Sequence, residues 1–328
     1  MSSRQRLSIA MTTYNGARFL PVQLASFESQ SRQPDQLVVC DDGSTDSTIA
    51  ILDQFARSAP FEVKVVRNAE NLGHERNFGK AISLAEGDII MLADQDDEWL
   101  PNKLSVVEHA FSAHPGVLLV ANNVMITDER LVPTGRTVIE QMRRSGLYGK
   151  RGQGLTLGCA TSFRRQLLEL ASPIPALDFG HDSWVHELAH ALDSRLIVPE
   201  VLQLYRRHGA NASNWGFDGA KPATPLTIMK PSAGKDLSPI WKKRERAFAL
   251  IGERLRSLGP QAYGRLGARR TYAEALAEVD NARDAVVRRM AVFGKGRTGR
   301  MRLALSLLLR GDYRHFLGWR SFLKDLIR

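Results

Sequence analysis

The chain of 328 residues has only two cysteines, Cys40 and Cys159, and no apolar run long enough to cross a bilayer. A membrane helix would need about 18 consecutive apolar residues. Two cysteines are too few for a disulfide framework, so we expect reduced thiols and a cytosolic setting. The polar start, Met1–Arg6, leads directly into an apolar stretch, which argues against a signal peptide. The 43% apolar content excludes a disordered chain.

Acidic residues are scarce in the last quarter of the chain. Residues 241–328 contain 21 Lys and Arg against 8 Asp and Glu, a net charge of +13, whereas residues 1–240 contain 24 against 27, a net charge of −3. A basic segment on a nearly neutral domain indicates an anionic surface as partner, either a membrane or a nucleic acid. Aromatic residues are few and no nucleic-acid module is recognisable, so we expect no nucleic-acid binding.

A glycine-rich phosphate loop is missing where a dinucleotide fold would require one. The turn after the first apolar stretch reads Thr12-Thr13-Tyr14-Asn15-Gly16 and lacks G-x-G-x-x-G. The string that does match, Gly294–Gly299, lies between predicted helices and follows no strand, so we expect a basic loop there. A bound diphosphate would therefore need a metal ion.

Short apolar runs alternate with helix-like patterns in the first hundred residues. Strands are expected at Leu7–Met11, Gln36–Cys40, Phe61–Arg67 and Gly87–Ala93, and helices at Arg18–Gln30, 49–55 and His74–Leu84. Ser44 or Asp46 could cap the second helix. This alternation predicts an α/β fold with a Rossmann-like, mostly parallel sheet. The carboxyl ends of its strands should share one edge, where such sheets bind ligands.

Asp94-Gln95-Asp96-Asp97 follows the fourth of these strands. Three carboxylates in four positions repel one another unless a cation or hydrogen-bond donors compensate them. Alternate carboxylates at a strand end can share one hard cation, which in turn neutralises a diphosphate. The tetrapeptide alone is also consistent with an acidic surface turn. The polar residues at the preceding strand ends favour a nucleotide site.

Four motifs in this order resemble those of family 2 glycosyltransferases with the GT-A fold. They are Thr13–Gly16, Asp41–Asp46, Asn71-Leu72-Gly73 with Arg76-Asn77, and Asp94–Asp97 with Trp99. The resemblance is nearest to rhamnosyltransferase-like enzymes of bacterial surface polysaccharides. It implies a hexosyl- or deoxyhexosyltransferase that moves a sugar, with inversion, from a nucleotide-diphosphate donor to a hydroxyl of a glycan or polyprenyl-linked acceptor.

The resemblance also implies roles for individual residues. Asp41 would accept a hydrogen bond from the base, Asp42 would order the loop, and Asp94 would contact the ribose or the donor sugar. Asp96 and His208 would bind Mg²⁺ or Mn²⁺. Further nucleotide contacts would come from Thr12, Thr13, Tyr14, Asn15, Gly43, Asn71, Arg76 and Gln95, and acceptor contacts from Asp97, Trp99 and Trp184.

A second half of the site is expected downstream. The segment Leu155–Phe163 resembles the family's strand beneath the acceptor, and His181–Trp184 resembles the motif that supplies the general base. An attacking hydroxyl must lose its proton, so one carboxylate within reach is required. Asp182 is the candidate, although it could simply cap a helix. Of Arg206 and Arg207, Arg207 is taken as the cation that stabilises the departing diphosphate.

The string His186–His190 has the H-E-x-x-H pattern of zinc proteases. No convincing third ligand motif follows it, and a protease would leave the nucleotide motifs unexplained. We expect instead that Trp184, Val185, Leu188 and Ala189 pack inward and that the histidines are partly solvated.

The expected domain organisation is a GT-A catalytic domain at residues 1–214, a linker or flap at 215–240 and a basic helical extension at 241–328. Helices are expected at Trp241–Leu258, Tyr272–Phe293 and Arg300–Leu309. Basic amphipathic helices suit an anionic bilayer, with Phe316, Trp319 and Phe322 as anchors, at the inner face of the cell membrane. A helical appendage with a solvated basic face is the alternative, and pairing with a second copy is open.

Two other functions remain compatible with the sequence. A sugar-phosphate nucleotidyltransferase should have a glycine-rich, lysine-containing loop after the first strand, which Thr12–Phe19 lacks. A non-catalytic sugar-nucleotide or glycan-binding module would need neither Asp182 nor the metal motif.

Overall fold

The computed structural model describes residues 4–145, 156–175, 180–209, 211, 238–293 and 295–327. The chain divides into two compact units. The first comprises Met1–Ile139, Leu155–Ala189 and Ser194–Trp215, and the second Glu140–Gly154, His190–Asp193 and Gly216–Arg328. The flap expected at residues 215–240 lies outside the described residues except for its last three, which begin helix α9.

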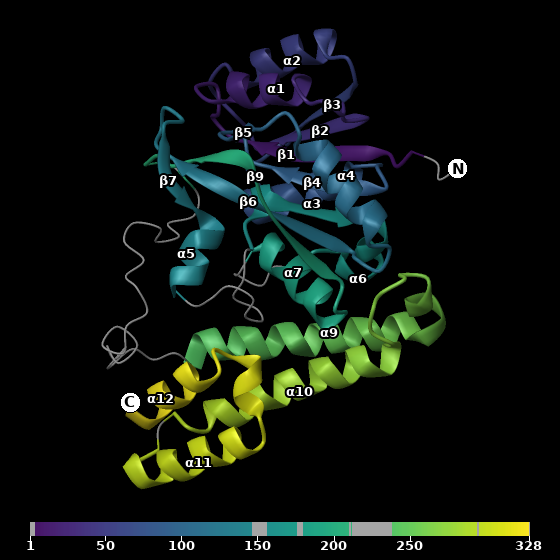
Figure 1. Cartoon of the computed structure of the whole chain (residues 1–328). Helices are drawn as coiled ribbons and strands as arrows, with labels where there is room; N and C mark the ends of the chain where they lie inside the picture. Colours follow the sequence, from purple (N-terminus) through teal and green to yellow (C-terminus); the bar gives the residue numbers. More distant parts are fainter. Residues whose placement is uncertain are drawn as a thin grey trace. The chain divides into compact units, whose positions relative to one another are not determined.

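One mixed sheet forms the centre of the first unit (Figure 1). In the described residues its strands follow the order β3-β2-β1-β4-β8-β6-β9-β5, with β7 paired to β6. The strands are β1 Leu7–Thr13, β2 Gln36–Asp41, β3 Glu62–Arg67, β4 Ile89–Ala93, β5 Glu98–Trp99, β6 Leu119–Thr127, β7 Pro133–Thr137, β8 Thr161–Arg164 and β9 Arg195–Arg206.

The first four strands are parallel, as the sequence predicts. Strand β8 is antiparallel to both β4 and β6, whereas β6 and β9 run parallel to each other. This arrangement places β9 several strands away from β1 while its carboxyl end still reaches the loop after β4. The fold class, a mostly parallel Rossmann-like sheet followed by C-terminal helices, is confirmed.

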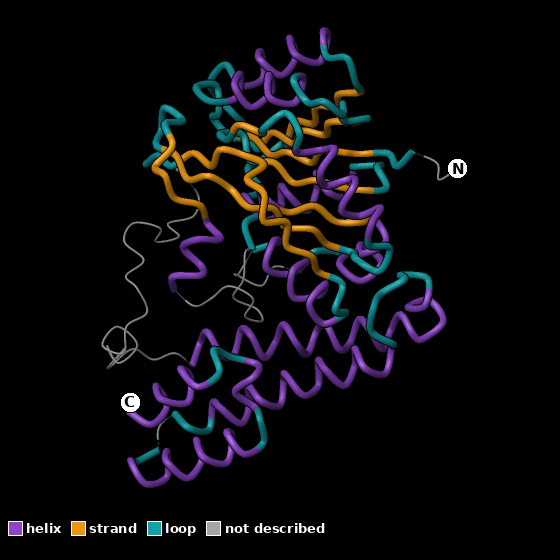
Figure 2. Tube along the Cα trace, viewed as in Figure 1, coloured by secondary structure: helices purple, strands orange, loops and turns teal. Residues whose placement is uncertain are grey.

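Helices cover the sheet on both faces (Figure 2). The main apolar core joins α1, α2 and α4 to alternate residues of the strands, among them Leu7, Ile9 and Met11 of β1. Helix α3 also contacts β1 and β2, but its residues are not part of this apolar core. The helices between residues 20 and 191 are α1 Leu20–Glu28, α2 Thr48–Ser58, α3 His74–Leu84, α4 Lys103–Ala113, α5 Val138–Ser145, α6 Leu168–Ala171 and α7 His181–Ala191. From Glu140 onward, α5 belongs to the second unit.

Of the two residues expected to cap α2, Asp46 accepts a hydrogen bond from the backbone N–H of Thr48 at 3.0 Å, whereas the Ser44 hydroxyl bonds to Asp41 and to the Asn15 N–H. The N-cap position itself is Ser47, whose side chain makes no cap bond. The strand expected up to Phe163 begins only at Thr161, since Gly158–Ala160 form a 3₁₀ turn. Strand β9 keeps pairing with β6 across a register shift.

The second unit contains α9 Ser238–Gly264, α10 Tyr272–Met290, α11 Arg297–Leu309 and α12 Trp319–Ile327. Helix α9 is bent at Gly259, whose φ of 72° ends one helical segment before Pro260 starts the next. Thr271 and Glu274 form a capping box that starts α10. In the described residues, no helix combines the length and apolar character that a membrane crossing requires.

Part of the basic charge of this unit lies inside it. Arg289 of α10 and Asp325 of α12 form a buried, two-pronged ion pair at 2.8 and 3.0 Å, and the Tyr313 hydroxyl donates to the same carboxylate. The Arg289 guanidinium also lies over the ring of Phe316, 4.5 Å from its centroid. Phe316 is only 1% exposed, so it is a core residue and cannot serve as the membrane anchor that the sequence suggested.

Replacing Asp325 by Ala should therefore destabilise the second unit strongly. It leaves the Arg289 guanidinium buried without its carboxylate, a loss that costs about 3–5 kcal/mol. The matched control is Asp280→Ala, which breaks the exposed Arg256–Asp280 pair and should cost less than about 1 kcal/mol. Urea unfolding measures both, and equal effects of the two substitutions would contradict the importance of the buried pair.

Candidate active site

The loop after β2 is organised around Asp41, which is 1% exposed. One carboxylate oxygen accepts from the backbone N–H groups of Gly43 and Ser44, at 3.2 and 2.9 Å. The other accepts from the hydroxyls of Thr13 and Ser44, at 2.7 and 2.5 Å. These four bonds fill the acceptor positions of a carboxylate. The predicted contact between Asp41 and a base would require one of them, such as the rotatable Ser44 hydroxyl, to be exchanged.

Asp42 holds the next loop, which leads into α3. It accepts from the Asn68 side chain at 2.8 Å and from the backbone N–H groups of Leu72 and Gly73 at 2.8 and 2.9 Å. Asn71 donates in return to the Asp42 carbonyl at 3.0 Å. The ordering role expected of Asp42 agrees with this geometry, and it sets the start of α3, where Arg76 is exposed in the first turn.

Gln95 belongs to the loop Asp94–Asp97 after β4, which we call the acidic loop, and joins it to the loop after β1. Its side-chain amide accepts from the Tyr14 N–H at 3.0 Å and donates to the Tyr14 carbonyl at 3.1 Å. A Cβ at Gly16 would lie 2.1 Å from the Gln95 Oε1, so any larger residue there would have to displace the Gln95 amide from this position. Asn15 accepts from the Thr45 N–H at 2.9 Å, which connects the β1 and β2 loops. Tyr14 itself is 51% exposed at this edge.

Asp96 and His208 meet although they are far apart in the sequence. The Asp96 Oδ2 lies 2.8 Å from the His208 Nε2 and 3.3 Å from the Asn211 amide nitrogen. Phe19, just before α1, stacks on the His208 ring with 4.5 Å between centroids. A carboxylate oxygen and an imidazole nitrogen are donors that suit Mg²⁺ or Mn²⁺, so this pair fits the divalent ion that the sequence implies.

The two arginines after β9 have different surroundings. Arg206 is 4% exposed, and its guanidinium donates to the carbonyls of Asp96 and Glu129, at 2.5 and 2.6 Å. It therefore cannot face a diphosphate and serves to join the acidic loop to β9. Arg207 is half-buried and donates to the Tyr205 hydroxyl at 3.3 Å. Of the two, Arg207 is the less buried.

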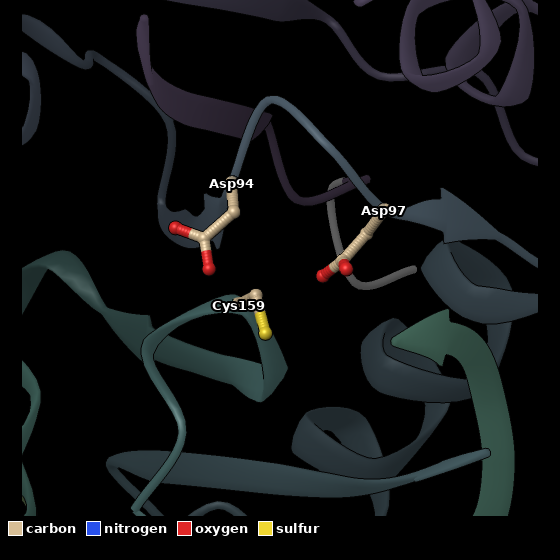
Figure 3. Close-up of side chains that lie close together, drawn as sticks. All are labelled: Asp94, Asp97 and Cys159. Carbon is tan, nitrogen blue, oxygen red and sulfur yellow. The ribbon is translucent and has the colours of Figure 1, made fainter. Parts of the chain in front are cut away.

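Asp94, Asp97 and Cys159 point toward one another beneath the acidic loop (Figure 3). One ligand atom from each lies within 4.8 Å of the others, so the three could hold a metal ion. Burial, together with the neighbouring Asp96, raises the pKa of Asp94 to about 7. Burial also raises the pKa of the Cys159 thiol well above its usual value, which disfavours the thiolate as a ligand.

Lys103 lies beneath this cluster, and burial lowers the pKa of its ammonium to about 7, whereas the charges of Asp97 and Asp94 favour the ammonium form. Its ammonium is 1% exposed, donates to the Cys159 carbonyl at 2.9 Å and to the Gln203 side chain, and lies 3.7 Å from the centroid of the Trp99 ring. Gln203 in turn donates to the Asp97 carboxylate at 3.1 Å. The sequence analysis missed Lys103, and the one available signal was a lysine in the first turn of a predominantly apolar segment, 103–113.

Asp182 lies in the first turn of α7, which begins at His181, and its carboxylate accepts from the Ser183 N–H at 2.6 Å. Burial raises the pKa of its carboxyl to about 6, and the charge of Asp94 contributes in the same direction. Asp182 is thus in electrostatic contact with the acidic loop. The preceding His181 is 3% exposed, stacks on Phe78 with 4.2 Å between ring centroids, and is kept neutral because burial lowers its pKa to about 3.

Comparison with known proteins identifies the family. The sequence profile of glycosyl transferase family 2 matches residues 8–169, which contain the acidic loop. Residues 8–169 belong to glycosyl transferase family 2. An uncharacterized glycosyltransferase of Nostoc sp. is 26% identical over 241 residues, 71% of this chain and 73% of the relative. A dTDP-rhamnosyl transferase of Shigella flexneri is 27% identical over 224 residues, 62% of this chain and 75% of the relative.

The fold of this glycosyltransferase agrees with the family. A crystal structure of S. aureus TarS in complex with UDP aligns with a TM-score of 0.56 and 16% identity, covering 98% of this chain and 89% of the TarS chain. The likeness shows that the GT-A fold is present, as the sequence motifs implied.

Three residues expected to contact the acceptor lie inside the glycosyltransferase instead. Asp97 is fully buried, and it accepts from the Arg206 N–H at 3.0 Å as well as from Gln203. Trp99 is 1% exposed and packs edge-on against Phe27, with 4.9 Å between ring centroids. Trp184 is also 1% exposed and donates from its indole to the Ala171 carbonyl at 3.0 Å. An acceptor in solvent cannot touch these side chains, so their roles are structural.

Helix α7 shows why its H-E-x-x-H string is not a zinc site. Val185 and Leu188 pack inward as expected, together with Trp184 and Ala189. His186 is 3% exposed and lies 2.8 Å from the Thr161 hydroxyl of β8. The expectation that His186 is partly solvated was therefore wrong, because the helix turns this face toward the sheet.

Replacing Lys103 by Met should destabilise the first unit by about 3 kcal/mol, because it leaves the Gln203 side-chain oxygen and the Cys159 carbonyl buried without this donor. Lys64→Met, at an exposed position of β3, is the matched control and should change stability by less than about 0.5 kcal/mol. Chemical denaturation compares them, and an unaltered Lys103→Met protein would show that the network is dispensable.

Proposed function

We propose that this family 2 glycosyltransferase moves a hexose or deoxyhexose from a nucleotide-diphosphate donor to a hydroxyl of a growing polysaccharide, with inversion at the anomeric carbon. The observation that carries the proposal is the 2.8 Å contact between Asp96 and His208 at the edge where the loops after β1, β2 and β4 meet. The Shigella flexneri relative, named as a dTDP-rhamnosyl transferase, supports a donor of this class. The complex of TarS with UDP supports a nucleotide diphosphate as ligand.

In the proposed complex the nucleotide lies along the edge formed by Thr12, Thr13, Tyr14 and Gly43, with Arg76 near its phosphates. Asp96 and His208 would hold a divalent ion, which supplies positive charge that neutralises the diphosphate. Asp94 would contact the ribose or donor sugar. Arg207 would donate to the leaving diphosphate as negative charge develops on it.

Asp182 is the proposed general base. As the acceptor hydroxyl attacks the anomeric carbon, its proton passes to the Asp182 carboxylate and the bond between the sugar and the diphosphate breaks. The proton thus ends on Asp182 and the electron pair on the nucleoside diphosphate. The acceptor is proposed to be glycan or polyprenyl-linked, which would place the reaction on the cytoplasmic side of the cell membrane.

Binding of the donor is tested by thermal shift with UDP, dTDP, GDP and CDP, each with Mn²⁺ or EDTA. A nucleotide at about 100 times its Kd should add roughly 2.7 kcal/mol of stability. We expect one nucleotide to stabilise the protein only with metal, and Asp96→Asn to abolish the effect. Asp53→Asn, on the exposed side of α2, should leave it unchanged. Absence of any metal-dependent shift in the wild type would overturn the proposal.

The role of Asp182 predicts a particular pH profile. The carboxyl must be ionised to accept a proton, and its pKa is about 6. The transfer rate should therefore rise about tenfold per pH unit below that value and level off above it. Asp182→Asn should lower the rate by about 10²–10⁴ at neutral pH while the nucleotide still binds.

Asp193→Asn is the matched control for this profile, because Asp193 is exposed at the end of α7 with a positive φ that Asn tolerates. Rates measured with a donor and a synthetic acceptor from pH 5 to 8 decide the matter. A flat profile in the wild type would remove Asp182 as base. Nucleotide binding without transfer or hydrolysis for any donor would favour a non-catalytic binding module.

A further inference from the structure

Helix α11 of the second unit has two apolar faces, and only one of them is covered. Ala304 and Leu307 are 0% and 3% exposed, so this face packs within the unit. The other face carries Met301, Leu305, Leu308 and Leu309, which are 51%, 43%, 42% and 88% exposed. Leu309 has the highest exposure given for any large apolar residue in the described part of the chain.

The four exposed side chains lie on a single stripe. Their spacing of four, seven and eight residues from Met301 brings them onto one side of a helix with 3.6 residues per turn. Arg297 and Arg302 fall on opposite sides of this stripe by the same rotation, and both are exposed. We call the stripe with these two arginines the α11 face.

The charge around the α11 face has one sign. Residues 294–311 contain Lys295, Arg297, Arg300, Arg302 and Arg310 and no Asp or Glu. The neighbouring α12 packs against α11 and exposes Trp319 at 57%. Figure 1 shows α11 and α12 near each other in the C-terminal unit. Exposed leucines between arginines are the composition of a helix that lies in the plane of an anionic membrane surface.

We propose that the α11 face docks this protein onto an anionic lipid bilayer. The leucines would enter the boundary between headgroups and acyl chains, and the flanking arginines would reach lipid phosphates while their stems cover apolar surface. The positive charge of the α11 face favours an anionic bilayer over a second copy of the chain or a nucleic acid. A second copy packed face to face would bring the arginines of both copies together, which is repulsive. A nucleic acid would satisfy the arginines but offers no apolar layer for the leucines.

The experiment is co-sedimentation of the full-length protein with vesicles of phosphatidylcholine alone, or of phosphatidylcholine and phosphatidylglycerol in equal amounts, without donor sugar. We expect binding to the anionic vesicles only, weakening as salt is raised. Leu305→Gln combined with Leu309→Gln should reduce the partition coefficient by at least about tenfold. Arg297→Gln and Arg302→Gln should each reduce it about fivefold.

Matched controls lie on exposed positions elsewhere. Val132→Gln, at a residue 57% exposed, controls for the loss of apolar surface, and Arg57→Gln, at an exposed position of α2, controls for the loss of charge. Both should bind vesicles like the wild type. Thermal melts of all variants confirm that these surface changes leave the fold intact. Vesicle binding needs neither donor nor acceptor, so its outcome is separate from that of the transfer assays.

Three outcomes would overturn the proposal. The first is a wild-type protein that stays in solution with anionic vesicles. The second is vesicle binding that the α11 variants leave unchanged. The third is self-association without lipid that the leucine variants abolish, measured by analytical ultracentrifugation, because the occupant of the face would then be a second copy.

Discussion

In the first unit, one buried carboxylate, that of Asp97, connects the acidic loop to strand β9. Asp97 accepts hydrogen bonds from the Arg206 backbone and the Gln203 side chain, and so ties the loop after β4 to β9. Its neighbour Asp96 can then meet His208, which follows the same strand. The Arg206 guanidinium adds a second link between this loop and β9, because it donates to the Asp96 carbonyl. Lys103 is buried among the same groups and bonds to the Gln203 side chain; burial lowers the pKa of its ammonium to about 7, whereas the charges of Asp97 and Asp94 act in the opposite direction.

The three carboxylates of the acidic loop differ in how deeply they are buried. Asp97 faces inward and is fully buried, whereas Asp94 and Asp96 are only partly buried and remain near the open edge. Burial raises the pKa of Asp94 and of Asp97, and the charge of the neighbouring Asp96 raises both further. A bound cation would relieve this repulsion. The cost of assembling like charges is therefore a physical reason for the site to prefer its metal-bound form.

Much of this arrangement could be predicted from the sequence, because local patterns determine it. Short apolar runs predicted the first four strands, and the helix at His74–Leu84 has the expected bounds. The motifs at the strand ends indicated the family. The errors arose where tertiary packing decides. Trp99 and Trp184 look like ligand-stacking residues in a motif, yet their burial depends on helices distant in sequence. Lys103 carries no motif, and only the fold shows that its ammonium is enclosed.

The saturation of Asp41 has a consequence for nucleotide choice. Since all four of its acceptor positions are occupied within the protein, a base could bind there only by exchange, replacing the Ser44 hydroxyl with its own N–H. The net gain would be the difference between two similar hydrogen bonds, which is far smaller than the value of either. Selectivity among nucleobases would then rest mainly on steric fit against the exposed Tyr14, and exchanging that ring would be the direct route to a different donor.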